Sequence, residues 1–321
     1  SLYKNLPGNR IVYEEINHDL GLVFSYEWST CERYGFVRKA SLRNLSGQEV
    51  ELDLLDGIRN LLPYGVEPLA QSTLSTLIDG YKQAERVPQL PAAIFSLSSI
   101  LSDRAEPSEA LKATVVWGLG LEEPRILVSE DQVRGFCLGE EPSEETFKRG
   151  KRGAFYVTAS VSIPSQEAVE WYLVADINQG AAQLTGLVED LRQSIDPVSV
   201  DKEIERGQET LKKLVGKADG FQYSADPLIS GRHFSNTLFN IMRGGVFQNS
   251  YAFSVNDFLQ FISAWNLGLK DASHQLLAGQ STLVDRDSVI ALAEQAGDPD
   301  LLRLSYEYLP LVFSRRHGDP S

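Results

Sequence analysis

The chain has 321 residues, of which 42% are hydrophobic, so it is long enough for one large or two ordinary globular domains with a buried core. Its net charge of −14, with no dense run of lysine and arginine, predicts repulsion from phosphate backbones and anionic lipid, so neither nucleic acid nor a membrane is an expected partner. The longest apolar run, which begins at Ala113, is far shorter than the ~20 residues that span a bilayer.

The cysteine content favours a reducing compartment. Cys31 and Cys137 are the only cysteines, which excludes a disulfide framework and leaves a single bridge open. No signal-peptide pattern opens the chain, and we expect a cytoplasmic protein. One glycosylation sequon begins at Asn44, where chance occurrence is the simpler interpretation. The sequence starts at once with a strand pattern and stops in a polar loop pattern, so we expect a piece of a longer protein.

The first half of the chain has the pattern of antiparallel sheet. From Ile11 to about Asp176, short alternating runs are separated by turn residues, and helical periodicity is nearly absent. Strand density of this order predicts two large packed sheets rather than a minimal immunoglobulin-like unit. The expected strands begin with 11–16, 22–28, 34–43 and 50–56, and continue with 71–78, 92–100, 112–119, 125–129, 154–163 and 170–177.

The stretch from Phe24 to Phe36 holds five aromatic rings and raises the question of whether it binds sugar or forms core. Side chains alternate between the two faces of a strand, so Leu22, Phe24, Tyr26 and Trp28 are expected on one face. Their apolar area and their alternation with polar neighbours favour a buried sheet face. The alternative keeps Trp28 or Tyr34 near the strand end, where an exposed ring could stack on a sugar.

After Asp176 the apolar period becomes that of helices. Helices are expected over 180–195, 198–215, 234–243, 254–265, 287–296 and 300–309. Ser254, Asp285 and Asp298 are the expected N-caps, and Gly297 is an expected helix stop.

Common catalytic motifs are missing from the sequence. It contains no GxGxxG, P-loop, HExxH, GxSxG or paired CxxC pattern, so nucleotide, zinc-protease and nucleophile-elbow sites lack support, and we expect no metal site. His18 is the one histidine of the strand half, and a solvated turn is favoured over a catalytic role. The acidic pairs that begin at Glu14, Glu122 and Glu140 are best explained as exposed strand ends and loops.

Three stretches together resemble the cellobiose and chitobiose phosphorylase family. They are FSYEWSTCERYGFVRKASLRNLSGQEVELDLLDGIRNLLP (24–63), LSDRAEPSEALKATVVWGLGL (101–121) and HFSNTLFNIMRGGVF (233–247). The resemblance implies a β plus α fold: a large antiparallel β-supersandwich of the galactose-mutarotase type, a helical linker and the first helices of an α/α toroid. The corresponding domains are residues 1–178, 179–225 and 226–321.

In that family the general acid is an aspartate of the toroid, and inorganic phosphate attacks the anomeric carbon. The chain stops before such a toroid is complete, so we carry no catalytic residue across and expect no cofactor, with phosphate a co-substrate of the complete enzyme. Expected partners are an oligosaccharide, the missing C-terminal helical catalytic domain and a second copy in a homodimer.

Two places are expected to contact substrate. Arg243, followed by two glycines, matches the family's first toroid helix and the loop after it, although a basic helix C-terminus with a glycine cap explains the same residues. Arg315, Arg316 and His317 combine forked donors with an imidazole, which suits phosphate or sugar hydroxyls, although a solvated loop is the simpler alternative.

The sequence therefore favours a non-catalytic carbohydrate-binding or structural portion of a glycoside phosphorylase or glycoside hydrolase. An independent carbohydrate-binding or mutarotase-like protein is the first alternative. A structural interaction module, in which the helices form an oligomer interface, is the second.

Overall fold

The computed structural model describes residues 1–99, 110–218, 220–221, 225–242 and 252–308. The chain divides into two compact units, Ser1–Leu211 and Lys212–Ser321. Within the described parts, no helix is long and apolar enough to cross a bilayer.

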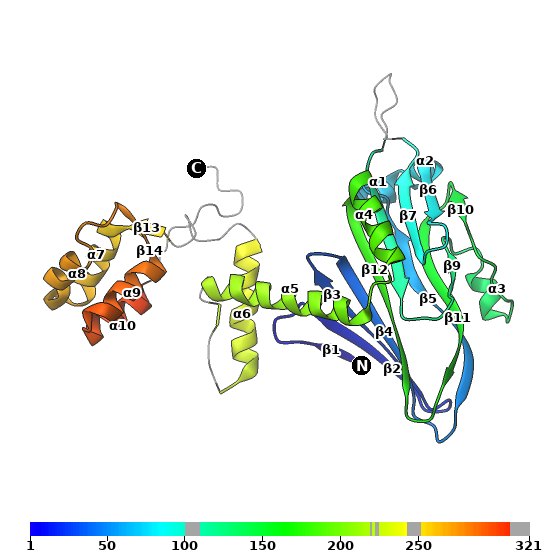
Figure 1. The fold of residues 1–321 in the computed structure, drawn as a ribbon, viewed down its shortest axis with the longest axis horizontal. Coiled ribbons are helices and arrows are strands. Elements are labelled where there is room, and N and C mark those ends of the chain that lie inside the picture. Colours follow the sequence, from blue (N-terminus) through cyan, green and yellow to red (C-terminus); the bar gives the residue numbers. More distant parts are fainter. Residues whose placement is uncertain (100–109, 219, 222–224, 243–251, 309–321) are drawn as a thin grey trace. The chain divides into compact units, whose positions relative to one another are not determined.

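The first unit is built on a nine-stranded antiparallel sheet with the order β1-β2-β3-β4-β12-β8-β7-β6-β10 (Figure 1). Its strands are β1 (Leu2–Lys4), β2 (Ile11–Asn17), β3 (Leu22–Cys31), β4 (Gly35–Asn44), β6 (Lys82–Arg86), β7 (Ala92–Leu97), β8 (Ala113–Leu119), β10 (Phe147–Arg149) and β12 (Ala168–Gln179). A three-stranded sheet, β5-β11-β9, consists of β5 (Val50–Leu61), β9 (Arg125–Leu127) and β11 (Gly153–Ile163).

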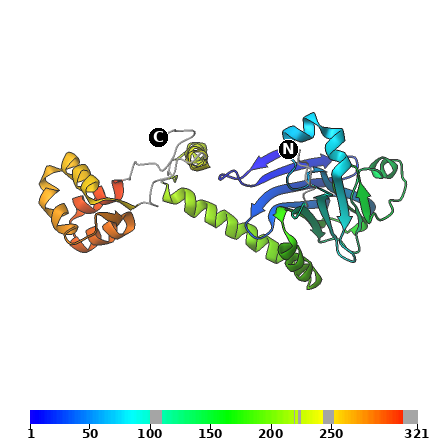
Figure 2. The ribbon, with the colours of Figure 1, turned by 90° about the horizontal axis from the view of Figure 1, so that it is seen from above.

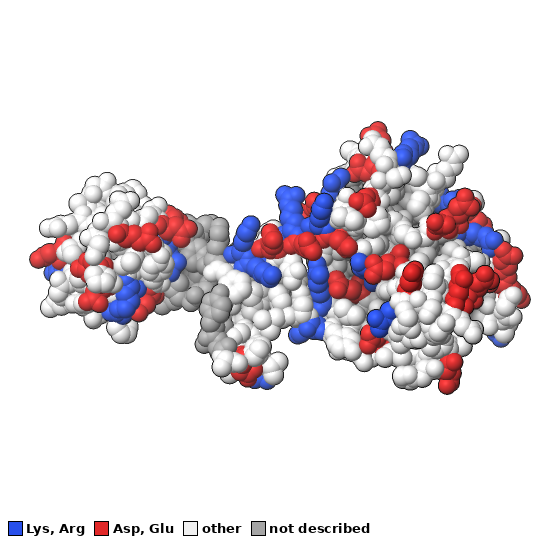
Figure 3. Space-filling model, turned by 60° about the horizontal axis from the view of Figure 1, so that its bottom comes forward, with Lys and Arg blue, Asp and Glu red and all other residues white. Residues whose placement is uncertain are grey.

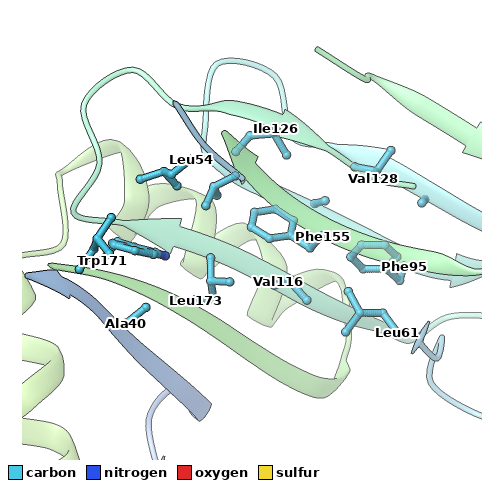
Figure 4. Close-up of a cluster of buried hydrophobic side chains, with 14 of the residues drawn as sticks. Ala40, Leu54, Leu61, Phe95, Val116, Ile126, Val128, Phe155, Trp171 and Leu173 are labelled. Carbon is cyan, nitrogen blue, oxygen red and sulfur yellow. The ribbon is translucent and has the colours of Figure 1, made fainter. Parts of the chain in front are cut away.

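The main core lies between these two sheets. Phe155 of β11 and Ile126 of β9 face Val116 of β8 and Leu173 of β12 (Figure 4), and all four side chains are at most 1% exposed. Burial of large apolar side chains contributes about 1.5–3 kcal/mol each and holds the sheets together. The predicted fold class, a large antiparallel sandwich followed by helices, is confirmed.

Two helices cover the opposite face of the large sheet. Helix α4 (Ala181–Arg192) and helix α5 (Pro197–Lys217) follow β12, and Val200 and Ile204 of α5 pack with Trp117, Tyr172 and other side chains of that face. Alternate residues of β8 and of the central part of β12 therefore face two different cores, which explains why β8 and residues 171–175 of β12 are nearly continuously apolar.

A charged cluster fixes α5 on the sheet. Lys39 Nζ lies 3.1 Å from Glu170 and 3.3 Å from Asp201 of α5, and Tyr172 donates a 3.0 Å hydrogen bond to the same Asp201 oxygen. Burial alone would lower the pKa of Lys39, but its hydrogen bonds to Tyr172 and Glu170 and the charge of Asp201 raise it. Lys39 is therefore held in its charged form at neutral pH.

The expected strand over 71–78 is wrong, because helices α1 (Pro68–Thr73) and α2 (Ser75–Tyr81) occupy this region. Pro68 stands at the first helical position, which its fixed backbone angle favours. Only Ile78 is buried here, while Leu74 and Leu77 are 54% and 53% exposed, and these three apolar residues have the i, i+3, i+4 spacing of a helix rather than the alternation of a strand. Helix α3 (Val133–Cys137) is a further short helix that the sequence did not predict.

The second unit contains α6 (Pro227–Met242) and a small helical core with its own strand pair. This core is formed by β13 (Ala252–Ser254), α7 (Val255–Trp265), the 3₁₀ helix η2 (Leu267–Leu269), α8 (Lys270–Leu276), β14 (Leu283–Asp285), α9 (Arg286–Ala296) and α10 (Pro299–Glu307). The caps at Asp285 and Asp298 are confirmed, since each carboxylate accepts two backbone N–H bonds, and Gly297 ends α9 at φ 70°. Ser254 precedes α7 without a side-chain cap. The domain limits at 178 and 225, and the toroid interpretation of 226–321, stay predictions.

Candidate functional site

Four residues were predicted to contact substrate. Arg243 and the group Arg315, Arg316 and His317 lie outside the described residues. His18 is an exposed residue of the β2–β3 turn, as the simpler interpretation expected. Asn44 is fully buried, which is incompatible with glycosylation of the sequon.

The aromatic residues of β3 form the best defined candidate site. Regular pairing with β2 and β4 places Tyr13 beside Tyr26, and Ile11 beside Trp28, on the face that also carries the sandwich core. We call Tyr13, Phe24, Tyr26 and Trp28 the aromatic strip. Strands β1 to β4 form one end of the first unit, and they are drawn in blue in Figure 2.

Ring contacts use most of the faces within the strip. Tyr13 and Tyr26 stack with centroids 4.9 Å apart, and Phe24 stacks on Trp171 at 6.1 Å. The guanidinium of Arg38 lies 4.3 Å from the centroid of Tyr26. Leu22, Phe24 and Tyr26 also pack against the main core, so the expectation of a buried sheet face is confirmed for these three residues.

Two rings at the ends of the strip, Tyr13 and Trp28, are exposed enough to contact a ligand. Tyr13 is 40% exposed at the β2 side. Trp28 is half-buried and contacts no other aromatic ring of the described residues. Tyr34, the other residue considered for sugar stacking, is 6% exposed and packs edge-on against Trp117 in the core beneath α4 and α5, so that alternative is wrong.

A buried ion pair forms the polar base of the strip. Arg38 donates from Nη1 to Asp56 Oδ2, and the indole N–H of Trp171 donates to the same oxygen over 2.6 Å. The side chains of Arg38 and Asp56 are 7% and 13% exposed. Both hydrogen bonds reach the same oxygen of Asp56, so this carboxylate joins Arg38 of β4 to Trp171 of β12 beneath the strip.

The chemistry of this arrangement is that of binding. Half-exposed aromatic rings beside an arginine and a carboxylate match the apolar faces and hydroxyl groups of a sugar. The placed histidines lie elsewhere: His18 in a turn, His233 in α6 and His274 in α8. Among the described residues, no group of three or more His, Cys, Asp or Glu side chains is arranged to hold a metal ion.

The structure brings two of the acidic pairs together. Glu122–Glu123 and Glu140–Glu141 line one hollow with Arg125, which pairs with Glu141. Acidic and basic side chains are interspersed over the first unit on the face that Figure 3 shows. The sequence contained these residues, but it gave no sign that the two loops meet.

A buried carboxylate organises the neighbouring loops. Glu145, 5% exposed, accepts from the backbone N–H of Val128 at 2.9 Å, from the Ser129 hydroxyl and from Gln132, and its carboxylate lies 3.1 Å from Lys148. Burial raises the pKa of Glu145, but these hydrogen bonds outweigh burial and hold it below its usual range.

Next to it, Lys148 and Lys151 donate to Asp131 and lower its pKa to about 2. The folded pKa lies below the ordinary 3.8, so the resulting stability is present above about pH 4 and is lost as the pH falls toward 2. Replacing Asp131 with asparagine is expected to lower the free energy of unfolding near pH 7 by about 1 kcal/mol, a value reduced because the side chain is about a third exposed.

Urea denaturation of the wild type and of Asp131→Asn between pH 2 and 7 measures this loss of stability. The two curves of unfolding free energy against pH are expected to converge near pH 2. Asp19→Asn, in the exposed β2–β3 turn, is the control. A difference between wild type and Asp131→Asn that is independent of pH would contradict the assignment.

One part of the chain is similar to a known family. Residues 247–310 match the model of glycoside hydrolase family 149 insertion domain 1. This range is less than half of the chain, and its described portion coincides with the helical core from β13 to α10. The match supports a carbohydrate-active protein of the glycoside hydrolase or phosphorylase type, whereas the specific resemblance to cellobiose and chitobiose phosphorylases stays a prediction.

No curated protein matches the sequence. Solved structures similar to it include the GH92 inverting mannosidase of Bacteroides thetaiotaomicron, with 9% identity over 71% of this chain and 25% of that one, at a TM-score of 0.37. A putative kojibiose phosphorylase from the human microbiome is 8% identical over 85% and 27% of the two chains, at a TM-score of 0.32. A galactose mutarotase-like protein from Clostridium acetobutylicum is 10% identical over 53% of this chain and 62% of that one, at a TM-score of 0.23. The chain thus spans about a quarter of the length of the first two.

Proposed function

We propose that the chain is a non-catalytic, carbohydrate-binding portion of a glycoside phosphorylase or glycoside hydrolase that acts on oligosaccharides. The observation that carries this proposal is the aromatic strip, where Trp28 and Tyr13 remain available beside the Arg38–Asp56 pair. The family-model match over 247–310 supports the enzyme type.

In this proposal a C-terminal helical domain supplies the general acid, and inorganic phosphate or water is the acceptor. Such a domain and an oligosaccharide are the proposed partners, and a homodimer is the proposed assembly. The two cysteines are free thiols, which agrees with a cytoplasmic location. The mutarotase-like alternative is less well supported, because the strip carries no imidazole to pair with a carboxylate.

Calorimetric titration of the 321-residue chain tests the proposal, with tetrasaccharides of glucose in α-1,4, β-1,3 and β-1,4 linkage and with chitobiose as probes. At least one probe is expected to bind, and Trp28→Ala is expected to weaken that binding about tenfold or more, because truncating a tryptophan that contacts the ligand removes a large contact area. Trp265→Ala, which removes a 72% exposed tryptophan of the second unit, is the matched control.

The same chain is expected to release no sugar phosphate from cellobiose and inorganic phosphate. Turnover by this chain would contradict the non-catalytic role. Binding that is unaffected by Trp28→Ala would remove the strip from the proposal.

A further inference from the structure

A second hollow lies where three loops of the first unit meet. The β6–β7 turn, the segment before β9 and the loop between α3 and β10 surround a cavity of about 680 Å³. We call it the loop hollow and define it by its six long polar side chains: Arg86, Gln89, Glu123, Arg125, Glu141 and Glu144. Its volume lies within the ~300–1,000 Å³ of ordinary small-molecule sites.

Hydrogen bonds and ion pairs fix the walls of the loop hollow. Arg86 lies 2.8 Å from Glu144, and Arg125 pairs with Glu141 and donates to the Pro142 carbonyl at 3.2 Å. The backbone N–H of Glu145 donates to the Ile126 carbonyl at 2.9 Å, and the Glu145 carboxylate accepts from the Val128 N–H at 2.9 Å, so both bonds hold the loop before β10 against β9. The loops are thus preorganised, which reduces the entropy lost when a ligand binds.

The backbone is strained at two of the lining residues. Gln89 has φ 63° and Glu123 has φ 42°, in the left-handed region that favours glycine. Long polar side chains at such positions carry a conformational cost, and strain of this kind collects at ligand sites. In addition, Arg86 Nε is buried and has no hydrogen-bond partner among the described residues.

The lining chemistry selects the class of ligand. Two arginines face three glutamates, and both arginines are already paired with carboxylates, so an anion such as phosphate is disfavoured. Arg86, Gln89 and Arg125 line the hollow as donors together with the carboxylate acceptors, and Leu90 and three prolines supply apolar surface. A neutral polyhydroxyl ligand satisfies both kinds of group, since each hydroxyl donates and accepts.

We propose that the loop hollow is a second saccharide-binding site, separate from the aromatic strip, which takes a neutral sugar unit of an oligosaccharide. This rests on the proposed carbohydrate function and adds to it a second point of contact. Gln89 and Glu123 contribute the amide and the carboxylate that lie on the two strained turns.

Glycine variants test the site with little risk to the fold. Gln89→Gly removes the amide while glycine accommodates φ 63°, so the chain is expected to stay folded. Gln166→Gly is the matched control, because Gln166 has φ 65° in the β11–β12 turn and does not line the hollow.

The readout is amide hydrogen exchange of the 321-residue chain with saturating tetrasaccharides of glucose in the three linkages. At least one probe is expected to slow exchange in segments 87–91, 121–125 and 139–145. Gln89→Gly is expected to lower the affinity measured there about tenfold, while Gln166→Gly leaves it unchanged.

The outcomes separate the two proposals. Slowed exchange in β2 and β3 alone would overturn the loop hollow and leave the aromatic strip intact. Slowed exchange in the loops alone, insensitive to Trp28→Ala, would support the loop hollow and overturn the strip. Loop protection by inorganic phosphate without saccharide would contradict a neutral ligand, and no slowed exchange anywhere would overturn both sites.

Discussion

Replacing Asn44 with aspartate is expected to lower the free energy of unfolding of the first unit by about 3 kcal/mol or more. Asn44 is fully buried, and its amide donates to the carbonyls of Gln48, Ile163 and Pro164 at 2.7, 2.9 and 3.3 Å. Its Oδ1 accepts from the Ser46 N–H at 2.8 Å. An aspartate keeps the acceptor but turns a carboxylate toward three carbonyl oxygens.

Urea denaturation followed by tryptophan fluorescence measures the effect. Asn178→Asp is the control, since this exposed asparagine accepts from Lys112 and a carboxylate there forms an ion pair. If Asn44→Asp stays within about 0.5 kcal/mol of the wild type, the side chain does not join β4 to the β11–β12 turn as the structure indicates.

Asp56→Ala is expected to cost about 3–5 kcal/mol, because it leaves the buried guanidinium of Arg38 without its counter-charge and Trp171 Nε1 without its acceptor. Arg38 and Asp56 come from the two different sheets, so the pair joins the layers at the base of the aromatic strip. Thermal and urea unfolding measure the loss.

The double variant Arg38→Met with Asp56→Leu is expected to regain the part of this stability that the unpaired charge costs, while the Trp171 N–H still lacks its acceptor. A double variant as unstable as Asp56→Ala alone would show that the loss comes from packing or from the Trp171 N–H rather than from the unpaired charge. Saccharide titration of the double variant then reports whether the polar base contributes to binding.

Local pattern predicted much of the first unit. Alternation placed Phe24, Tyr26 and Trp28 on one face of a strand, because the two-residue period of a strand leaves no other choice once one face is buried. Strand prediction failed for residues 71–78, because the apolar residues Leu74, Leu77 and Ile78 follow the spacing of a helix face rather than alternation.

The candidate sites were harder to predict, because they depend on contacts between distant segments. Arg38 meets Asp56 only through the packing of one sheet on the other, and Glu123 approaches Glu141 only through the meeting of two loops. The pattern of a single sequence does not indicate which residues of one sheet lie opposite which residues of the other. Helix caps such as Asp285 and Asp298 were predictable, since the signal lies within four residues.

The order of strands in the large sheet governs when this unit can assemble during synthesis. β1 to β4 pair with one another in sequence, but the second edge of β4 pairs with β12 and β5 pairs with β11, so these two strands wait for partners beyond residue 152. Until Gln179 has left the ribosome, a nascent chain carries β4 as an open edge and β5 without a neighbour. Such exposed edges favour association with other chains, so chaperone binding to these strands during translation is advantageous for this topology.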